Sequence, residues 1–319
     1  MIEKEVIFNS GDIKLAGSLC LPADEGSFPG VLMIHGSGPV DRDENTRQLK
    51  LFKVKLNIFN TIAHYLADKG IASLRYDKRG CGKSSGSSGD AGLHDLIEDG
   101  RAAYEYLATQ EHIKKHLTFL LGHSEGTMIA PRIAVEHHDI AGLILLGAQA
   151  QNLEEALKYQ ARKIKEDIEQ GKGLNRFITR MVWKLMRYDP VKTQPIILQK
   201  VRSTDKASFR YKGQTVNAKW LREHFDYNPL ETLLDVTCPI LAITGEKDIQ
   251  VDPQDVVRIA EQAKGDVEYH IVPNLTHILR LDEGPPSILS YKKLLKKDMD
   301  ASLLDTIYNW LKTKVAAGL

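Results

Sequence analysis

Cysteine is scarce in this sequence of 319 residues, which contains only Cys20, Cys81 and Cys238. An odd number of widely spaced cysteines gives neither a disulfide framework nor the C-x-x-C pairs of a structural zinc site. No other cluster of metal-ligand residues and no phosphate-binding P-loop occurs. The sequence therefore predicts a protein of a reducing compartment with no metal and no cofactor.

Long apolar runs and an excess of one charge are also lacking. The longest apolar runs, such as residues 143–146, fall far short of the roughly 20 residues of a membrane span. The first ten residues carry three charges and no apolar core of signal-peptide length. The 43 Lys and Arg residues balance 42 Asp and Glu residues, so the net charge of +1 argues against general affinity for nucleic acid. We expect a cytoplasmic protein with no membrane span.

What the sequence does contain is an alternation of strand-like and helix-like segments. Eight apolar runs read as strands: 5–9, 13–21, 30–35, 71–76, 117–121, 142–147, 240–244 and 267–272. Segments with helical periodicity separate most of them: 49–68, 93–110, 125–138, 253–263 and 301–314. Short continuous apolar runs are typical of strands buried on both faces of a parallel sheet. We therefore predict an α/β fold with a mostly parallel eight-stranded sheet flanked by helices.

Residues 151–230 interrupt this alternation between the sixth and seventh strands. They contain no convincing buried strand, and their 17 Lys and Arg against 9 Asp and Glu give a net charge of +8. The sequence therefore predicts an α/β core formed by residues 1–150 and 231–319, with residues 151–230 inserted as a basic helical cap.

The clearest chemical motif is G-H-S-E-G at residues 122–126, directly between a predicted strand and a predicted helix. A serine on such a turn projects its hydroxyl above the sheet, and the flanking glycines leave room for the turn. Ser124 is the predicted nucleophile, and the backbone N–H of Glu125 is a predicted donor to an oxyanion. The alternative is a serine that only caps the following helix.

A second turn, H-G-S-G-P at residues 35–39, follows the third strand. The loop after this strand supplies the second oxyanion-hole N–H in hydrolases with a nucleophile elbow. We assign that donor to Ser37, with Gly36 as the less favoured alternative. His35 ends a buried strand, and a structural role there is favoured over that of general base.

The acid and the base are expected after the last two strands. Asp248 follows the seventh strand in G-E-K-D and is favoured over Glu246 and Asp252. His277 follows the eighth strand, and the order Ser124, Asp248, His277 is the Ser, Asp, His order of α/β hydrolases. The three residues are the predicted catalytic triad.

The sequence resembles the α/β-hydrolase fold superfamily over about residues 5–150 and 231–315. More narrowly, I-H-G-S-G-P at 34–39 with D-R-D at 41–43, together with G-H-S-E-G, looks like bacterial carboxylesterases related to dipeptidyl-peptidase and acylaminoacyl-peptidase hydrolases. The run at 76–84 is similar to their D-x-R-G-x-G-x-S loop. The resemblance implies a helical cap and a structural role for Arg79.

These features predict a serine hydrolase that cleaves small or medium acyl esters through an acyl-enzyme intermediate. Thioesters and the N-termini of peptides are the alternative substrates, and a catalytically silent binding protein is a remote alternative. Cleavage at a peptide N-terminus is less favoured, because a substrate ammonium needs acidic groups and the predicted cap is basic. The predicted partner is a small-molecule ester, and the oligomeric state stays open.

The predicted cap offers candidates for substrate contact. Phe177, Met181 and Trp183 have helical spacing and could form either the core of the cap or the wall of the acyl pocket. Four basic residues on one face of the same helix could line the entrance and favour acidic esters. They are Arg176, Arg180, Lys184 and Arg187.

Overall fold

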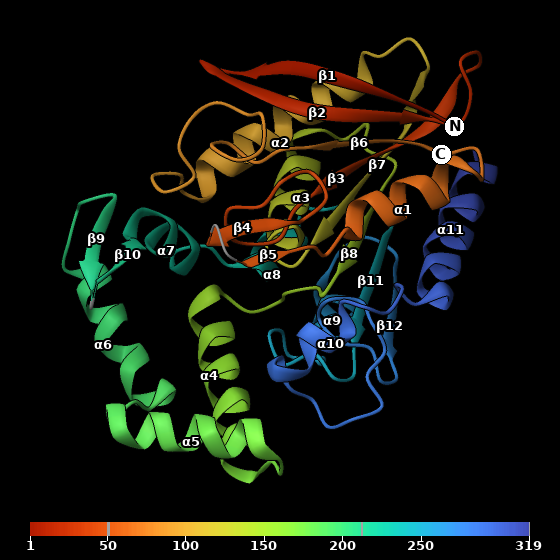
Figure 1. Ribbon diagram of the computed structural model, residues 1–319. Helices are drawn as coiled ribbons and strands as arrows, with labels where there is room; N and C mark the ends of the chain where they lie inside the picture. The colour runs from red at the N-terminus through yellow and green to blue at the C-terminus, as the bar shows by residue number, and fades with distance from the viewer. Residues whose placement is uncertain (50–51, 212, 319) are drawn as a thin grey trace.

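A computed structural model describes residues 1–49, 52–211 and 213–318, and its centre is an eight-stranded sheet (Figure 1). The strands, in their order across the sheet, are β1 (Ile2–Ser10), β2 (Ile13–Leu21), β6 (Ala72–Tyr76), β3 (Phe28–Ile34), β7 (Ile113–His123), β8 (Gly142–Leu146), β11 (Ile240–Gly245) and β12 (Val267–Val272). β1 pairs antiparallel with β2, and β2 pairs antiparallel with β6. All the other pairs in this sheet are parallel, so the predicted α/β fold with its mostly parallel sheet is confirmed.

Helices cover both faces of the sheet, because alternate residues of the central strands point to opposite sides. Leu32 and Ile34 of β3 belong to a core with α2 (Leu93–Ala108), α3 (Gly126–Glu136) and α9 (Asp255–Gln262). Val31 and Met33 belong to a second core with α1 (Ile58–Ala67) and α11 (Ala301–Ala316). The carboxyl ends of the parallel strands carry the loops that build the site.

The predicted helix over residues 49–68 is wrong in its first part. α1 begins only at Ile58, after Asn57 in a left-handed conformation with φ 48°. The residues before it form a small antiparallel hairpin of β4 (Thr46–Leu49) and β5 (Phe52–Val54). Positions 50 and 51 of the predicted helix lie outside the described residues.

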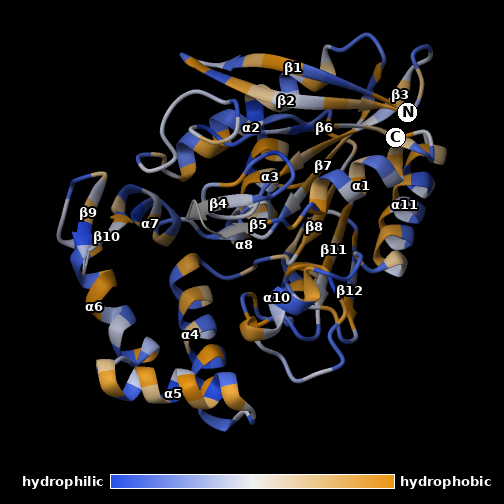
Figure 2. Cartoon of the chain, in the orientation of Figure 1, coloured by the Kyte–Doolittle hydropathy of each residue, from blue (hydrophilic) through white to orange (hydrophobic). Residues whose placement is uncertain are grey.

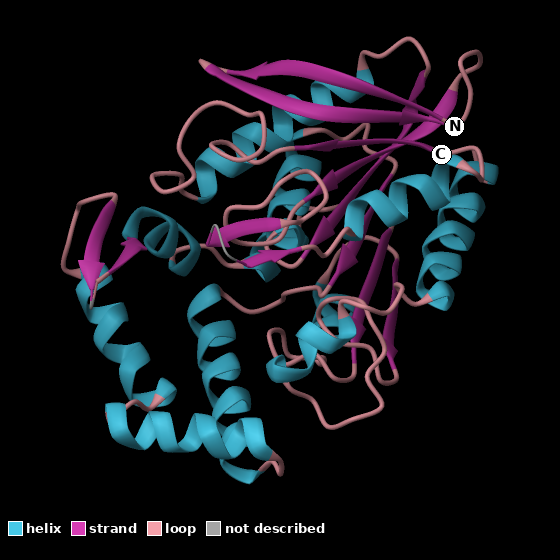
Figure 3. Ribbon diagram, in the orientation of Figure 1, coloured by secondary structure: helices cyan, strands magenta, loops and turns pink. Residues whose placement is uncertain are grey.

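The segment between β8 and β11 is largely helical. It contains α4 (Leu153–Gln170), α5 (Leu174–Met186), α6 (Pro190–Arg202), α7 (Ala218–Phe225) and α8 (Pro229–Leu233). α4, α5 and α6 make a U whose closed end, α5, lies away from the sheet (Figures 1 and 3). A hairpin of β9 (Ser208–Tyr211) and β10 (Gln214–Asn217) also occurs there. We predicted no strand in this segment, because strands this short carry no apolar run.

Among the helices of the described residues, none combines the length and the apolar character needed to cross a bilayer.

Candidate active site

Ser124 lies on a tight turn between β7 and α3. Its φ of 52° is in the left-handed region, and its N–H donates to the carbonyl of Leu146 at 2.9 Å. A Cβ on Gly122 would lie 2.2 Å from the carbonyl oxygen of Gly126, and one on Gly126 would lie 2.0 Å from that of Ile34. Both glycines are therefore required by close backbone approach, and the turn raises the Ser124 hydroxyl above the sheet.

The structure brings Ser124, His277 and Asp248 together from three loops. His277 Nε2 lies 3.0 Å from Ser124 Oγ, and His277 Nδ1 lies 2.7 Å from Asp248 Oδ2. The other oxygen of Asp248 accepts the N–H groups of Gln250 and Val251 at 2.8 and 2.9 Å. Because the carboxylate can only accept, Nδ1 carries the proton, and Nε2 is free to accept a proton from Ser124.

Gly147 supports this arrangement and was not singled out from the sequence. It follows β8 with φ 60°, and a Cβ there would lie 3.2 and 3.3 Å from Cε1 and Nδ1 of His277. A side chain at this position would crowd the imidazole and strain the backbone.

The alternative candidates for the acid and the base, Glu246, Asp252 and His35, contact other groups. Glu246 accepts the N–H of Asn274 at 3.1 Å, and Asp252 pairs with Arg258 at 3.0 Å. His35 is buried, and its Nε2 contacts the carbonyl oxygen of Tyr76. Burial, with the nearby Lys78 ammonium, lowers the pKa of His35, so a neutral structural histidine fits this position.

The backbone donors near Ser124 differ in whether they are already engaged. Gly36 N–H donates to Glu44 Oε1 at 2.6 Å, whereas within residues 1–49, 52–211 and 213–318 neither Ser37 N–H nor Glu125 N–H donates to another group. A Cβ on Gly36 would lie 3.3 Å from that of Ser124, so this loop passes close to the nucleophile. The geometry favours Ser37 over Gly36 as a donor to an oxyanion.

Glu44 and His123 form a buried pair behind the site that the sequence analysis missed. Glu44 Oε2 lies 2.7 Å from His123 Nδ1, and His123 Nε2 donates to the carbonyl of His277 at 3.1 Å. Burial disfavours a charged imidazole, but Glu44 outweighs it and raises the pKa of His123. Both ring nitrogens lie near oxygen atoms, which favours the protonated imidazole. No motif or spacing identified Glu44, which lies in a loop with φ 61°.

A second buried pair joins Glu125 to Lys78. Lys78 Nζ donates to Glu125 Oε2 at 2.6 Å and to the carbonyl of Gly36 at 2.7 Å. Glu125 also accepts the indole N–H of Trp220, and its Oε1 lies 3.0 Å from His224 Nε2. Burial opposes the charge on Glu125, but Lys78 and His224 outweigh it and lower its pKa. Helix α7 is thus linked to the residue that follows the nucleophile.

Arg79, which follows Lys78 in this loop, binds Asp99 with two hydrogen bonds of 2.7 Å each. It also donates to the carbonyl of Asp95 at 2.8 Å. These bonds fit the structural role that the resemblance implied.

A cavity of about 480 Å³ opens beside Ser124 and His277. Gln160 and Ile164 of α4 contribute to its wall. The remaining lining residues are mostly apolar or neutral: Gly36, Ser37, Val40, Glu44, Thr46, Val54, Leu56, His123, Gln250, Ile278, Ile288 and Tyr291. Among the described lining residues Glu44 is the one carboxylate, and no Lys or Arg is present.

The predicted pocket residues of α5 are not among the residues that line this cavity. Phe177 and Met181 are 55% and 56% exposed, and Trp183 packs edge-on against Tyr188 with 5.5 Å between ring centroids. The structure therefore does not place these three residues in the wall of this cavity. Helical spacing shows which residues share a face of a helix, but it does not show which way that face points.

The basic residues proposed for the entrance also have other roles. Arg176 pairs with Asp167 at 2.6 Å. Arg180 donates to the carbonyls of residues 168, 169 and 171 at the end of α4. These two cations therefore stabilise the α4–α5 corner instead of facing the catalytic cavity.

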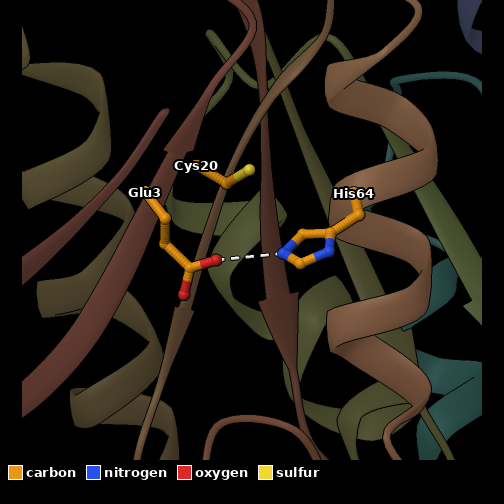
Figure 4. Close-up of side chains that lie close together, drawn as sticks. All are labelled: Glu3, Cys20 and His64. Atoms are coloured by element: carbon orange, nitrogen blue, oxygen red, sulfur yellow. Dashed lines mark hydrogen bonds and ion pairs between the residues drawn. The ribbon is translucent and has the colours of Figure 1, made fainter. Parts of the chain in front are cut away.

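One group of side chains has the composition of a metal site. Glu3, Cys20 and His64 offer ligand atoms that all lie within 4.8 Å of one another (Figure 4). Arg75 already binds Glu3 at 2.8 Å, and burial raises the pKa of the Cys20 thiol to about 11. A neighbouring guanidinium and a protonated thiol both disfavour a cation, so we assign no metal to this group.

Comparison with known proteins agrees with the fold. The family model of the serine aminopeptidases, S33 (Hydrolase_4), matches residues 54–284. Esterase EstD of Thermotoga maritima is 26% identical over 97% of this chain and 67% of its own length.

Two solved structures share the fold. Est1E from Butyrivibrio proteoclasticus with bound ferulic acid is 19% identical, covers 98% of this chain and 99% of its own, and superposes with a TM-score of 0.62. Proline iminopeptidase from Mycobacterium smegmatis is 15% identical, covers 99% of this chain and 100% of its own, and superposes with a TM-score of 0.63. The resemblance to the α/β-hydrolase superfamily is confirmed, and the chain belongs to the serine aminopeptidase S33 family of α/β-fold serine hydrolases.

Proposed function

We propose that this protein hydrolyses uncharged carboxylic esters of small or medium acyl groups through an acyl-enzyme on Ser124. The observation that carries the proposal is the chain of contacts from Ser124 Oγ through His277 to Asp248, at 3.0 and 2.7 Å. The esterase name of the Thermotoga maritima relative supports ester chemistry.

Acylation begins when Ser124 Oγ attacks the carbonyl carbon and His277 Nε2 takes the hydroxyl proton. The carbonyl oxygen becomes an oxyanion, which the N–H groups of Ser37 and Glu125 stabilise. Asp248 holds the resulting imidazolium in place. The carbonyl then re-forms, the bond to the alcohol oxygen breaks, and His277 gives its proton to the departing alcohol.

Deacylation repeats these steps with water. His277 Nε2 takes a proton from a water molecule as its oxygen attacks the acyl carbon. The bond to Ser124 Oγ breaks, Oγ regains the proton from His277, and the carboxylic acid leaves. Every proton is returned, so no cofactor or metal is required.

The lining of the cavity supports an uncharged substrate. Glu44 is engaged by His123 and by Gly36 N–H, which leaves no unpaired carboxylate among the described lining residues to bind a peptide ammonium. The absence of Lys and Arg among the same residues gives an acidic ester no counter-charge. We also propose that residues 151–230 act as a cap, because Gln160 and Ile164 of α4 close one side of the cavity.

The test compares Ser124→Ala with Ser302→Ala, an exposed serine of α11, using p-nitrophenyl acetate and butyrate. We expect Ser124→Ala to lose on the order of 10⁴–10⁶-fold in kcat, because the nucleophile is removed. A fluorophosphonate probe should label the wild type and Ser302→Ala but not Ser124→Ala. Retained hydrolysis or labelling in Ser124→Ala would contradict the proposal.

Aminoacyl-naphthylamides assayed beside the esters test the substrate class. Faster cleavage of these amides than of the esters would replace esterase activity with aminopeptidase activity.

A further inference from the structure

Helix α5 turns its apolar face outward. Six large apolar residues recur at positions i, i+3, i+4, i+7, i+8 and i+11, which places them on one side of the helix. They are Leu174, Phe177, Ile178, Met181, Val182 and Leu185. Leu174 is 71% and Leu185 is 86% exposed, and α5 has no buried residue. The hydropathy colouring shows apolar residues along this helix (Figure 2).

The polar side of α5 is the side that packs against the rest of the protein. Arg176 is paired with Asp167 of α4, and Arg180 binds three carbonyls at the end of α4. Surface helices normally bury their apolar side and expose their polar side. The arginine contacts hold α5 in the opposite orientation, with its apolar face away from α4.

Other exposed apolar residues follow α5 in the sequence. Met186 at the end of α5 is 69% exposed, and Val191 and Ile196 of α6 are exposed as well. Monomeric soluble proteins rarely expose a contiguous apolar patch of this kind unless a partner or a membrane covers it.

The charge around the apolar face indicates what covers it. Residues 171–203 contain eight Lys and Arg residues and one acidic residue, Asp189, so this segment carries +7 of the net +8 of residues 151–230. Asp189 is already paired with Lys165 of α4. Within the described part of the chain, Arg176 and Arg202 have carboxylate partners, Arg180 binds backbone carbonyls, and Lys200 lies over the ring of Tyr211. The side chains of the other four cations of the segment have no ion pair there: Lys172, Lys184, Arg187 and Lys192.

We propose that α5 docks on an anionic lipid surface, with its apolar face in the interface and the unpaired Lys and Arg side chains on the lipid headgroups. An amphipathic helix rich in Lys and Arg, with Phe and Leu on its other face, has the composition of helices that lie in membrane interfaces. A second copy of this chain fits less well, because joining two α5 faces would bring two segments of charge +7 together. The inference does not depend on the reaction proposed for Ser124.

The test measures co-sedimentation of the full chain with vesicles of phosphatidylcholine alone and with vesicles containing one quarter phosphatidylglycerol. We expect binding to the anionic vesicles to be at least tenfold tighter than to the neutral ones, and to weaken as salt is raised. Phe177→Ser/Leu185→Ser should lose at least tenfold in this binding. The double variant Lys184→Gln/Arg187→Gln should bind the anionic vesicles more weakly, and its binding should depend less on the salt concentration.

Leu234→Ser is the matched control, since Leu234 is 51% exposed but lies outside α5 and α6, and its binding should equal that of the wild type. Hydrolysis of p-nitrophenyl acetate without vesicles should be the same for all variants, which shows that each one folds. Equal binding to both kinds of vesicle, or unchanged binding of Phe177→Ser/Leu185→Ser, overturns the proposal. A dimer seen by light scattering that this double variant abolishes, without vesicle binding by the wild type, also overturns it and assigns the face to a second copy.

Discussion

Glu44 links three parts of the site through the hydrogen bond and the ion pair of its carboxylate. Its carboxylate binds Gly36 N–H in the oxyanion loop and His123 next to the nucleophile. His123 in turn donates to the backbone of His277. A single buried carboxylate thus connects the loops that carry the proposed oxyanion donors, the proposed nucleophile and the proposed base.

Replacing Glu44 by Gln should lower kcat by about 10- to 100-fold with little change in KM, because removing an oxyanion donor outright costs about 10²–10³-fold and here the loop is only loosened. Steady-state kinetics with p-nitrophenyl butyrate measures the effect. Glu246→Gln is the control, since Glu246 lies in the loop that carries Asp248 but is an exposed carboxylate whose hydrogen bond is to the N–H of Asn274. Unchanged kcat in Glu44→Gln would show that the pair does not position the site.

The His123 pair also predicts how stability depends on pH. Folding raises the pKa of His123 above its unfolded value of about 6.5. The protonated ring therefore contributes fully to the free energy of unfolding below about pH 6.5, and this contribution is lost as the pH rises through the folded pKa. The groups that face the ring are Glu44, His277 and Asp248. The difference in unfolding free energy between the wild type and His123→Gln should therefore shrink as pH is raised from about 6 to 10.

Urea unfolding at several pH values measures this difference. His270→Gln serves as the control, because among the described residues the partner of the His270 ring is the exposed Glu268 of its own strand. A difference that stays constant or grows with pH would contradict the assigned ionisation of His123.

At the scale of elements, the loop after β6 and helix α7 meet at the start of α3. Lys78 comes from that loop, Trp220 and His224 come from α7, and all three contact Glu125. The helix contributed by residues 151–230 therefore touches the residue whose N–H we propose as an oxyanion donor.

Lys78→Met should destabilise the protein by about 3–5 kcal/mol, because it leaves the carboxylate of Glu125 buried beside no ammonium. Lys83→Met, in the same loop, removes an ammonium that pairs with Glu5 at the surface and should cost no more than about 1 kcal/mol. Urea unfolding of both variants gives the comparison. Equal losses of stability would contradict the importance of the buried pair.

The sequence predicted the strands of the main sheet because each is a local apolar run between turn residues. Ser124, Asp248 and His277 were predicted to meet because each follows such a strand, and the structure brings them within hydrogen-bonding distance. The inward side of α5 could not be predicted, since it depends on contacts of Arg176 and Arg180 with another helix. Glu44 escaped prediction because only tertiary contacts give a loop carboxylate its partners.

At the scale of the whole molecule, residues 151–230 contact the rest of the protein through α4 and through the region of α7. Tyr159 and Gln160 of α4 donate to the carbonyls of Asp248 and Gln250, at 3.2 and 2.9 Å. Near α7, Asn217 donates to the carbonyl of Ala91 at 2.8 Å. α5 lies between these attachments and is held by its neighbours at the end of the U.

Amide hydrogen exchange should reflect this attachment. Because α5 has no buried residue, its amides should exchange through local opening, well before those of β7 and β8, whose side chains fill the core. Exchange followed by mass spectrometry on peptides of these elements measures the difference, with α4 expected to be intermediate. Protection of α5 equal to that of β7 would show that its apolar face is covered in solution.

The contact between Ser124 and His277 joins positions 153 residues apart in the chain. During synthesis Ser124 emerges long before His277, so a nascent chain that ends anywhere before His277 carries the proposed nucleophile without its proposed base. The side chains also come together only after β11 has paired with β8 across the intervening helices. During refolding, hydrolysis should therefore recover with the slow formation of the contacts that are most distant in the chain. This recovery should come later than the formation of the secondary structure.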